Sequence, residues 1–121
     1  MKNEIIEITT QEVERRLISL RGQKVLLDRD VAELYGVQTK EINQAVKNNP
    51  RKFPSRYLIQ VDQNEKDELV KNFDRFEMLK HSTVLPTAFT EQGLYMLSTI
   101  LKSEQATETS IAIIDTFAMV R

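Results

Sequence analysis

The sequence contains no cysteine and a single histidine, His81. Without cysteine, these 121 residues can form no disulfide, thiol-based active site, cysteine-ligated zinc site or iron–sulfur cluster. With one histidine, they hold no histidine-rich metal site and no catalytic centre built on two histidines. The longest runs without Asp, Glu, Lys or Arg are residues 81–90 and 92–101, about half the length of a transmembrane helix. No apolar stretch follows Met1 as in a signal peptide, so we expect a cytoplasmic protein with no membrane span and no metal.

Glycine and proline are also scarce, with three residues of each, and the chain has no Gly/Ser linker, repeat or low-complexity tract. Apolar residues make up 40% of the chain, which is enough to build a core. A length of 121 residues is typical of one domain. We therefore expect residues 1–121 to form a single domain.

The net charge of −1 hides an uneven distribution of charged residues. Residues 38–56 carry five Lys or Arg and one Glu, a net charge of +4, and we call this segment the basic island. The flanking segments 1–37 and 57–121 have net charges of −1 and −4. A nucleic-acid backbone responds to such a local patch and not to the total charge of the protein.

Short β-prone runs alternate with helical periodicity, which predicts an α+β fold with a small antiparallel sheet. The strands are expected within residues 17–27, 57–61 and 86–89. The first of these segments reads as a hairpin, because Gly22 can take the positive φ of a tight turn. The helices are expected at residues 10–16, 28–35, 39–49, 62–73, 90–101 and about 104–121. Residues 74–84 carry no clear pattern.

Residues 28–49 carry the strongest pattern in the chain, that of a helix-turn-helix. Asp28 can cap a first helix, which Gly36 ends, and Gln38 or Thr39 can cap a second helix. Ala32 is small enough for the second helix to cross closely. The residues expected to pack between the two helices are Val37, Ile42 and Val46.

The outer face of the second helix has the chemistry of a major-groove reader. Asn and Gln amides can pair with adenine through two hydrogen bonds, and lysine can reach guanine or phosphate. The expected base contacts are Thr39, Lys40, Asn43, Gln44 and Lys47. The expected phosphate contacts are Arg51, Lys52 and Arg56, which follow this helix. The alternative interpretation is a solvated face on an ordinary pair of helices.

The tip of the expected hairpin also has two interpretations. Arg21, Gln23 and Lys24 would act as a wing if they entered the minor groove or lay along the DNA backbone. Otherwise the tip is a solvated turn without a role in binding.

Nothing in the sequence predicts an enzyme. The segment Thr90-Glu91-Gln92-Gly93 fits the start of a helix, where Thr90 caps, Glu91 complements the helix dipole and Gly93 allows a close helix–strand contact. No paired carboxylates, nucleophile–base pair or phosphate-binding loop is evident. We therefore expect no catalytic residue and no cofactor.

Ordered together, several motifs resemble the ORF-six-N (ORF6N) domain family, which is related to the KilA N-terminal and Bro N-terminal domains of phages and large DNA viruses. The resemblance extends over roughly residues 14–121, and its motifs lie at residues 21–26, 31–37, 42–49, 85–93 and 96–102. It implies a double-stranded DNA-binding domain of a phage- or prophage-type transcription regulator or antirepressor-like protein. Such a domain is not regarded as an enzyme, and it would act at the nucleoid of a bacterial host.

The last expected helix offers a surface for a partner. Ile111, Ile114, Phe117 and Val120 recur at intervals of three, and a homodimer formed through them would present two DNA half-sites. The same helix supports an alternative function, a protein-interaction or oligomerisation module that sequesters a repressor or another partner without binding DNA. Because this helix runs to Arg121 without a capping residue, we expect it to continue into a further region or to pack on a partner chain.

Overall fold

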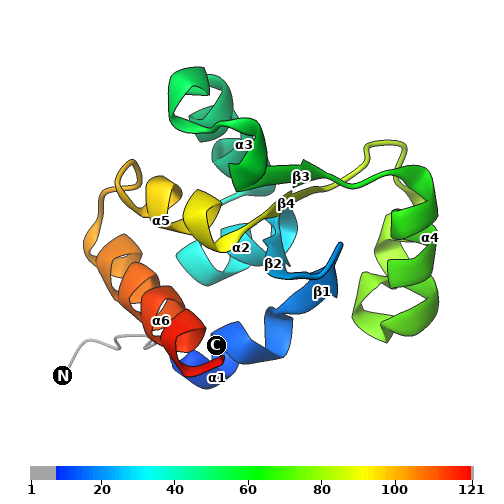
Figure 1. The fold of residues 1–121 in the computed structure, drawn as a ribbon, viewed down its shortest axis with the longest axis horizontal. Coiled ribbons are helices and arrows are strands. Elements are labelled where there is room, and N and C mark those ends of the chain that lie inside the picture. The colour runs from blue at the N-terminus through cyan, green and yellow to red at the C-terminus, as the bar shows by residue number, and fades with distance from the viewer. Residues whose placement is uncertain (1–7, 121) are drawn as a thin grey trace, which may run out of the picture.

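The computed structural model describes residues 8–120 and shows an α+β fold in which helices surround a four-stranded antiparallel sheet (Figure 1). The strands are β1 Ile18–Leu20, β2 Gln23–Leu27, β3 Leu58–Gln60 and β4 Thr87–Phe89. The α-helices are α1 Thr10–Arg16, α2 Asp28–Tyr35, α3 Thr39–Lys47, α4 Gln63–Asn72, α5 Glu91–Ser98 and α6 Glu104–Val120. The 3₁₀ helices are η1 Pro50–Lys52, η2 Ser55–Tyr57 and η3 Asp74–His81. The two ends of the expected domain, at residues 1–7 and at Arg121, lie outside the described residues.

The hairpin forms as the sequence predicts. β1 and β2 pair antiparallel, with Leu20 opposite Gln23. The two turn residues, Arg21 and Gly22, both have positive φ, of 53° and 78°. Two consecutive left-handed residues give the kind of turn that matches the twist of the adjoining strands. Gly22 therefore has the role that was expected of it.

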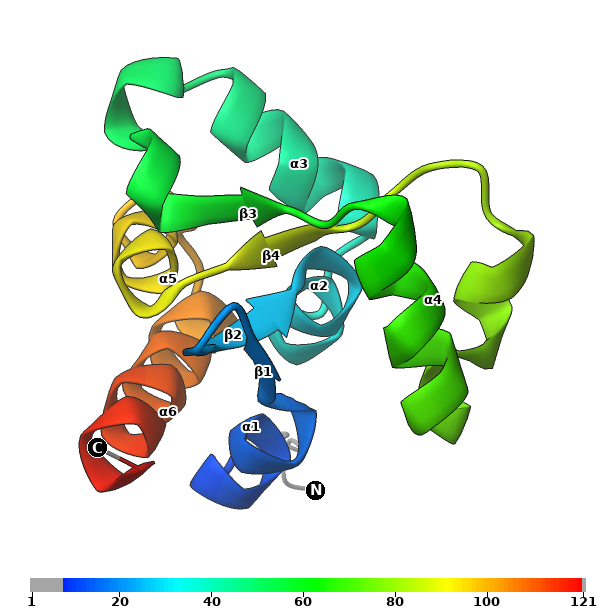
Figure 2. The same cartoon turned by 45° about the vertical axis from the view of Figure 1, so that its right-hand side comes forward.

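The sheet runs in the order β1-β2-β4-β3, and its two faces contact different layers. Successive strand residues point to opposite faces, so that Leu26 and Phe89 join one core while Leu27 and Ala88 join the other. The first core includes residues of α1, α2, α3, α5 and α6, and the second includes residues of α4 and η3. Figure 2 shows α4 on one side of the strands and α5 and α6 on the other.

Helix α6 packs along α2 and closes the first core. The Thr109 hydroxyl donates to the Leu34 carbonyl at 3.0 Å, and the Tyr35 and Ser110 hydroxyls lie 2.7 Å apart. The Phe117 ring makes an edge contact with the Tyr95 ring. These contacts hold α6 against α2 and α5.

The four residues of the expected partner face on α6 do not share one side of the helix. Phe117 is only 3% exposed and belongs to the core, whereas Ile111 and Ile114 are 49% and 44% exposed. In a helix of 3.6 residues per turn, each three-residue step falls about 60° short of a full turn. Phe117 is therefore rotated by about 120° from Ile111, and a constant spacing of three does not mark one face.

Two expected helix boundaries also differ. Leu27, not Asp28, occupies the N-cap position of α2, and Asp28 is the first helical residue and is buried. The helix expected over residues 90–101 ends at Ser98, because the amides of Thr99 and Ile100 bond three residues back and tighten the last turn. Within residues 8–120, no helix combines the length and the apolar character needed to cross a membrane.

Candidate nucleic-acid interface

Helices α2 and α3 are joined by residues 36–38 and pack against each other as expected. Gly36 ends α2 with a φ of 71°, and the Val37 amide bonds back to the Ala32 carbonyl at 2.9 Å. At the start of α3, the Gln38 amide donates to the Glu41 carboxylate at 2.9 Å. Ile42 is fully buried on the inner face of α3. Together these contacts fix the direction in which the outer face of α3 points.

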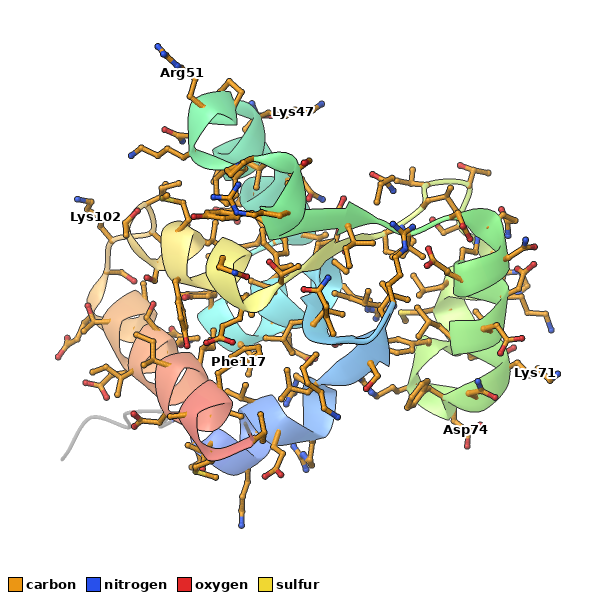
Figure 3. The ribbon with its side chains drawn as sticks, in the orientation of Figure 1. Lys47, Arg51, Lys71, Asp74, Lys102 and Phe117 are labelled. Atoms are coloured by element: carbon orange, nitrogen blue, oxygen red, sulfur yellow. The ribbon has the colours of Figure 1, made fainter. Side chains whose placement is uncertain are left out.

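The structure brings most of the expected contact residues onto one projecting part of the molecule. Lys40, Gln44 and Lys47 are exposed on α3, whereas Thr39 and Asn43 are half-buried. In Figure 3, Lys47 and Arg51 extend away from the body of the protein. The expected base contacts thus form one helical face, and the expected phosphate contacts continue from its end.

The loop after α3 is fixed by a buried aromatic residue. Phe53 lies between η1 and η2, is buried, and makes an edge contact with Phe89 of β4 at 6.5 Å between ring centroids. Arg51 and Lys52 before it and Arg56 after it are exposed. This anchor presents the three cations at the surface.

The cations of the basic island differ from many others in having no acidic partner. Among the described residues, none of its five Lys and Arg side chains forms an ion pair with a carboxylate. Its single acidic residue, Glu41, accepts a hydrogen bond from the Gln38 amide instead. Elsewhere, ion pairs are formed by Arg15, Arg16, Arg21, Arg75 and Lys80. The island therefore has five positive charges available for an external anion.

The two amide side chains of α3 are in different environments. The Asn43 Nδ2 atom donates to Oδ2 of Asp28 at 3.0 Å, a contact between α3 and the first turn of α2. The Gln44 Nε2 atom donates to Oδ1 of Asn48 at 2.9 Å, within the exposed surface of the same helix. Asn43 is thus held by a buried group, whereas Gln44 is held only by an exposed neighbour.

The expected wing is attached to a different part of the molecule. The Arg21 guanidinium donates to both oxygens of Glu65 on α4, at 2.7 and 2.9 Å, and to the Gln60 carbonyl. The hydrogen bond from Arg21 holds the pKa of Glu65 below its ordinary value. Gln23 and Lys24 are exposed on β2. The structure therefore places Arg21 in a contact within the fold and does not bring it together with α3.

Comparison with known families decides the class of this chain. The ORF6N domain model matches residues 15–100. The chain belongs to the ORF6N domain family. No curated protein and no solved structure matches it.

The ORF6N match includes the sheet, the α2–α3 pair and the basic island, and it ends before α6. Sequence reasoning missed two features of this ORF6N domain. Lys102, in the loop between α5 and α6, also extends away from the body of the protein in Figure 3, although it lies far outside the basic island in sequence. Asp28 was expected only as a helix cap, and no local signal showed that it would contact Asn43.

Proposed function

We propose that this ORF6N domain binds double-stranded DNA as part of a phage- or prophage-type transcription regulator or antirepressor-like protein. In this proposal α2 and α3 act as a helix-turn-helix, and α3 enters the major groove. The domain acts where DNA is, at the nucleoid in the cytoplasm of a bacterial host, and needs no catalytic residue, metal or cofactor.

One observation supports this proposal above the others: the five cations on α3 and in the loop after it form no ion pair with any carboxylate of residues 8–120. A protein that neutralises phosphates releases the counterions of DNA, and this release supplies most of the sequence-independent affinity. Lys40 and Lys47 are on the helix, and Arg51 and Lys52 follow its end. Cations in this arrangement can hold both the base edges and the neighbouring backbone.

A fluorescence-anisotropy titration with a labelled duplex of random sequence tests the proposal. With five phosphate contacts, the affinity should fall by about 500-fold between roughly 50 and 200 mM salt. A chain that fails to bind duplex DNA at the lower salt concentration contradicts the proposal.

A protein-interaction module is the second candidate, because α6 has an unpartnered apolar face within the described residues. Ile111, Ile114 and Met119 are exposed there. A homodimer would use these residues and not Phe117, which is in the core, or Val120, which is half-buried and about 180° around the helix from Ile111. Sedimentation of the wild type and of Ile111→Glu separates the two states. A dimer that Ile111→Glu converts to a monomer, in a chain that binds no duplex DNA at low salt, supports this candidate, and a wild-type monomer that binds duplex DNA contradicts it.

A further inference from the structure

The buried carboxylate of Asp28 has an unusual set of partners. Asp28 is 6% exposed and forms no ion pair among the described residues. Its Oδ1 atom accepts from the Arg29 amide at 2.8 Å. Its Oδ2 atom accepts from Nδ2 of Asn43 at 3.0 Å and from the Thr87 amide at 3.4 Å. The carboxylate thus connects the start of α2 with β4 and with one side chain of α3.

Helix capping does not explain this carboxylate, because Leu27 occupies the N-cap position of α2. A buried charge is unfavourable unless hydrogen bonds satisfy it, and among residues 8–120 the only side chain that donates to Asp28 is that of Asn43. The two residues are 15 positions apart in the sequence. Their contact therefore depends on the way α3 crosses α2.

A carboxylate can only accept hydrogen bonds, so it also decides which way the Asn43 amide faces. The nitrogen must point towards Asp28, because the amide oxygen would be repelled. One N–H of Nδ2 is used by Asp28, and a second N–H and the Oδ1 atom remain. Within residues 8–120, no group donates a hydrogen bond to this Oδ1 atom.

The remaining edge of the Asn43 amide has one donor and one acceptor side by side. Adenine presents the complementary pair in the major groove, the N7 acceptor and the N6 donor, whereas guanine presents two acceptors. Asp28, Thr39 and Asn43 all line an open groove of about 1030 Å³ beside α3. The amide is therefore held in one orientation at a surface that a base can approach.

We propose that Asp28 is a positioning residue that fixes the Asn43 amide in the orientation that reads adenine. This inference rests on the DNA-binding function proposed above and adds a specificity to it: the preferred site contains an adenine opposite Asn43. A fixed amide does not have to reorganise when it binds, and the wrong bases meet an unpaired donor or acceptor.

Selection from a pool of duplexes with a randomised centre provides the test, with the wild type compared with Asp28→Asn and Asn43→Ala. An asparagine at position 28 can accept or donate, so it tolerates both orientations of the Asn43 amide. We expect a preference of about tenfold for adenine at one position in the wild type, a preference reduced to about twofold in Asp28→Asn, and none in Asn43→Ala. The double variant should show no further loss, because Asp28 acts through Asn43.

Asp30→Asn is a matched control. Asp30 is on the same helix, is 4% exposed, and pairs with Arg75 instead of Asn43. Both substitutions remove one negative charge near DNA, so a general change in affinity should appear in both variants, whereas a loss of adenine preference should appear only in Asp28→Asn. If Asp28→Asn does not fold, Asp28→Ser also replaces the carboxylate with a group that can both accept and donate a hydrogen bond, and it should lose the same preference.

The outcomes separate this inference from the proposed function. A wild type that binds DNA, with the same adenine preference in Asp28→Asn, overturns the role of Asp28 and leaves the DNA-binding function standing. An unchanged preference in Asn43→Ala overturns it as well. A wild type that binds no duplex at low salt overturns both.

Discussion

Among residues 8–120, four of the five arginines outside the basic island form ion pairs with carboxylates, whereas no Lys or Arg of the island does. Arg75 donates to both oxygens of Asp30 at 2.9 Å and to the Arg16 carbonyl at 3.1 Å. Its guanidinium also lies 4.1 Å from the centre of the Phe76 ring. Lys47 and Arg51, in contrast, have no acidic partner among residues 8–120 and extend away from the protein (Figure 3).

This difference follows from where the acidic residues are. The basic island holds one acidic residue, whereas the segments on either side of it have an excess of acidic residues. Among residues 8–120, five of the ten Lys and Arg residues outside the island form an ion pair with a carboxylate, whereas none of the five in the island does. We therefore expect substitutions of paired cations to change mainly stability, and substitutions of island cations to change mainly DNA affinity.

The largest expected effect is on DNA binding by Lys47→Ala/Lys52→Ala. Each phosphate contact contributes about a factor of eight to affinity at roughly 0.1 M salt, so the loss of two contacts should weaken binding by about 50-fold. Both side chains are exposed, and the thermal midpoint should stay nearly constant. Anisotropy with a random duplex and thermal unfolding measure the two properties.

Lys71→Ala/Lys80→Ala is the matched control, because it removes two exposed lysines outside the island. Lys71 projects from α4 at the far side of Figure 3 from Lys47. We expect less than a twofold change in affinity. Equal weakening by the two double variants would mean that the island has no special part in binding.

Arg75→Ala should have the next largest effect, this time on stability. It leaves the Asp30 carboxylate buried without its cation, which is costly even though Arg75 itself is partly exposed. The free energy of unfolding should fall by about 2 kcal/mol, as measured by urea denaturation. DNA affinity of the folded variant should change by less than twofold, and a large loss of affinity with normal stability would contradict the comparison.

The stability lost in Arg75→Ala should depend on pH. Burial raises the pKa of Asp30 above its ordinary value, and Arg75 opposes this shift by its hydrogen bonds and its charge. With a raised pKa, the folded state binds the proton more tightly than the unfolded state, so stability falls as pH rises through the pKa of the folded state. Without Arg75 nothing from that side chain opposes the raised pKa of Asp30, so this fall in the free energy of unfolding is larger. Urea denaturation should therefore show a larger difference from the wild type at about pH 7 than at about pH 4, and an equal difference contradicts the assignment.

The smallest effect is expected for Arg21→Ala in the hairpin. Arg21 is engaged by Glu65 and by the Gln60 carbonyl, so it should contribute little to DNA binding. We expect a change in affinity of less than twofold in the anisotropy assay. A loss comparable to that of an island lysine would mean that the hairpin leaves α4 and acts as a wing.

The parts of the fold that local chemistry determines could be predicted from the sequence. Gly22 and Gly36 marked turns that need positive φ, and both have it. Gly93 marked a close contact, and a Cβ there would lie 2.1 Å from the Tyr57 carbonyl oxygen. The uneven distribution of charge predicted where unpaired cations would be found.

The parts that depend on how distant elements cross could not be predicted. Arg75 and Asp30 are 45 residues apart, and no spacing rule joins them. Lys66 is one of several charged residues of α4, yet it is buried and donates to the Ser82 carbonyl at 2.6 Å. The partner of the Asn43 amide likewise follows from helix packing. Sequence patterns therefore predicted the surface that would be basic, but not the contacts that orient its side chains.

The central claim is that the cations of the basic island, which form no ion pair among residues 8–120, bind the phosphates of DNA. The salt dependence of the affinity for duplex DNA tests this claim most directly. The logarithm of the association constant for a random duplex should fall with the logarithm of the salt concentration with a slope of about −4.5 for five contacts. The slope should be about −2.7 for Lys47→Ala/Lys52→Ala and should stay at the wild-type value for Lys71→Ala/Lys80→Ala. A wild-type slope near zero, or the same slope in both double variants, would contradict the account.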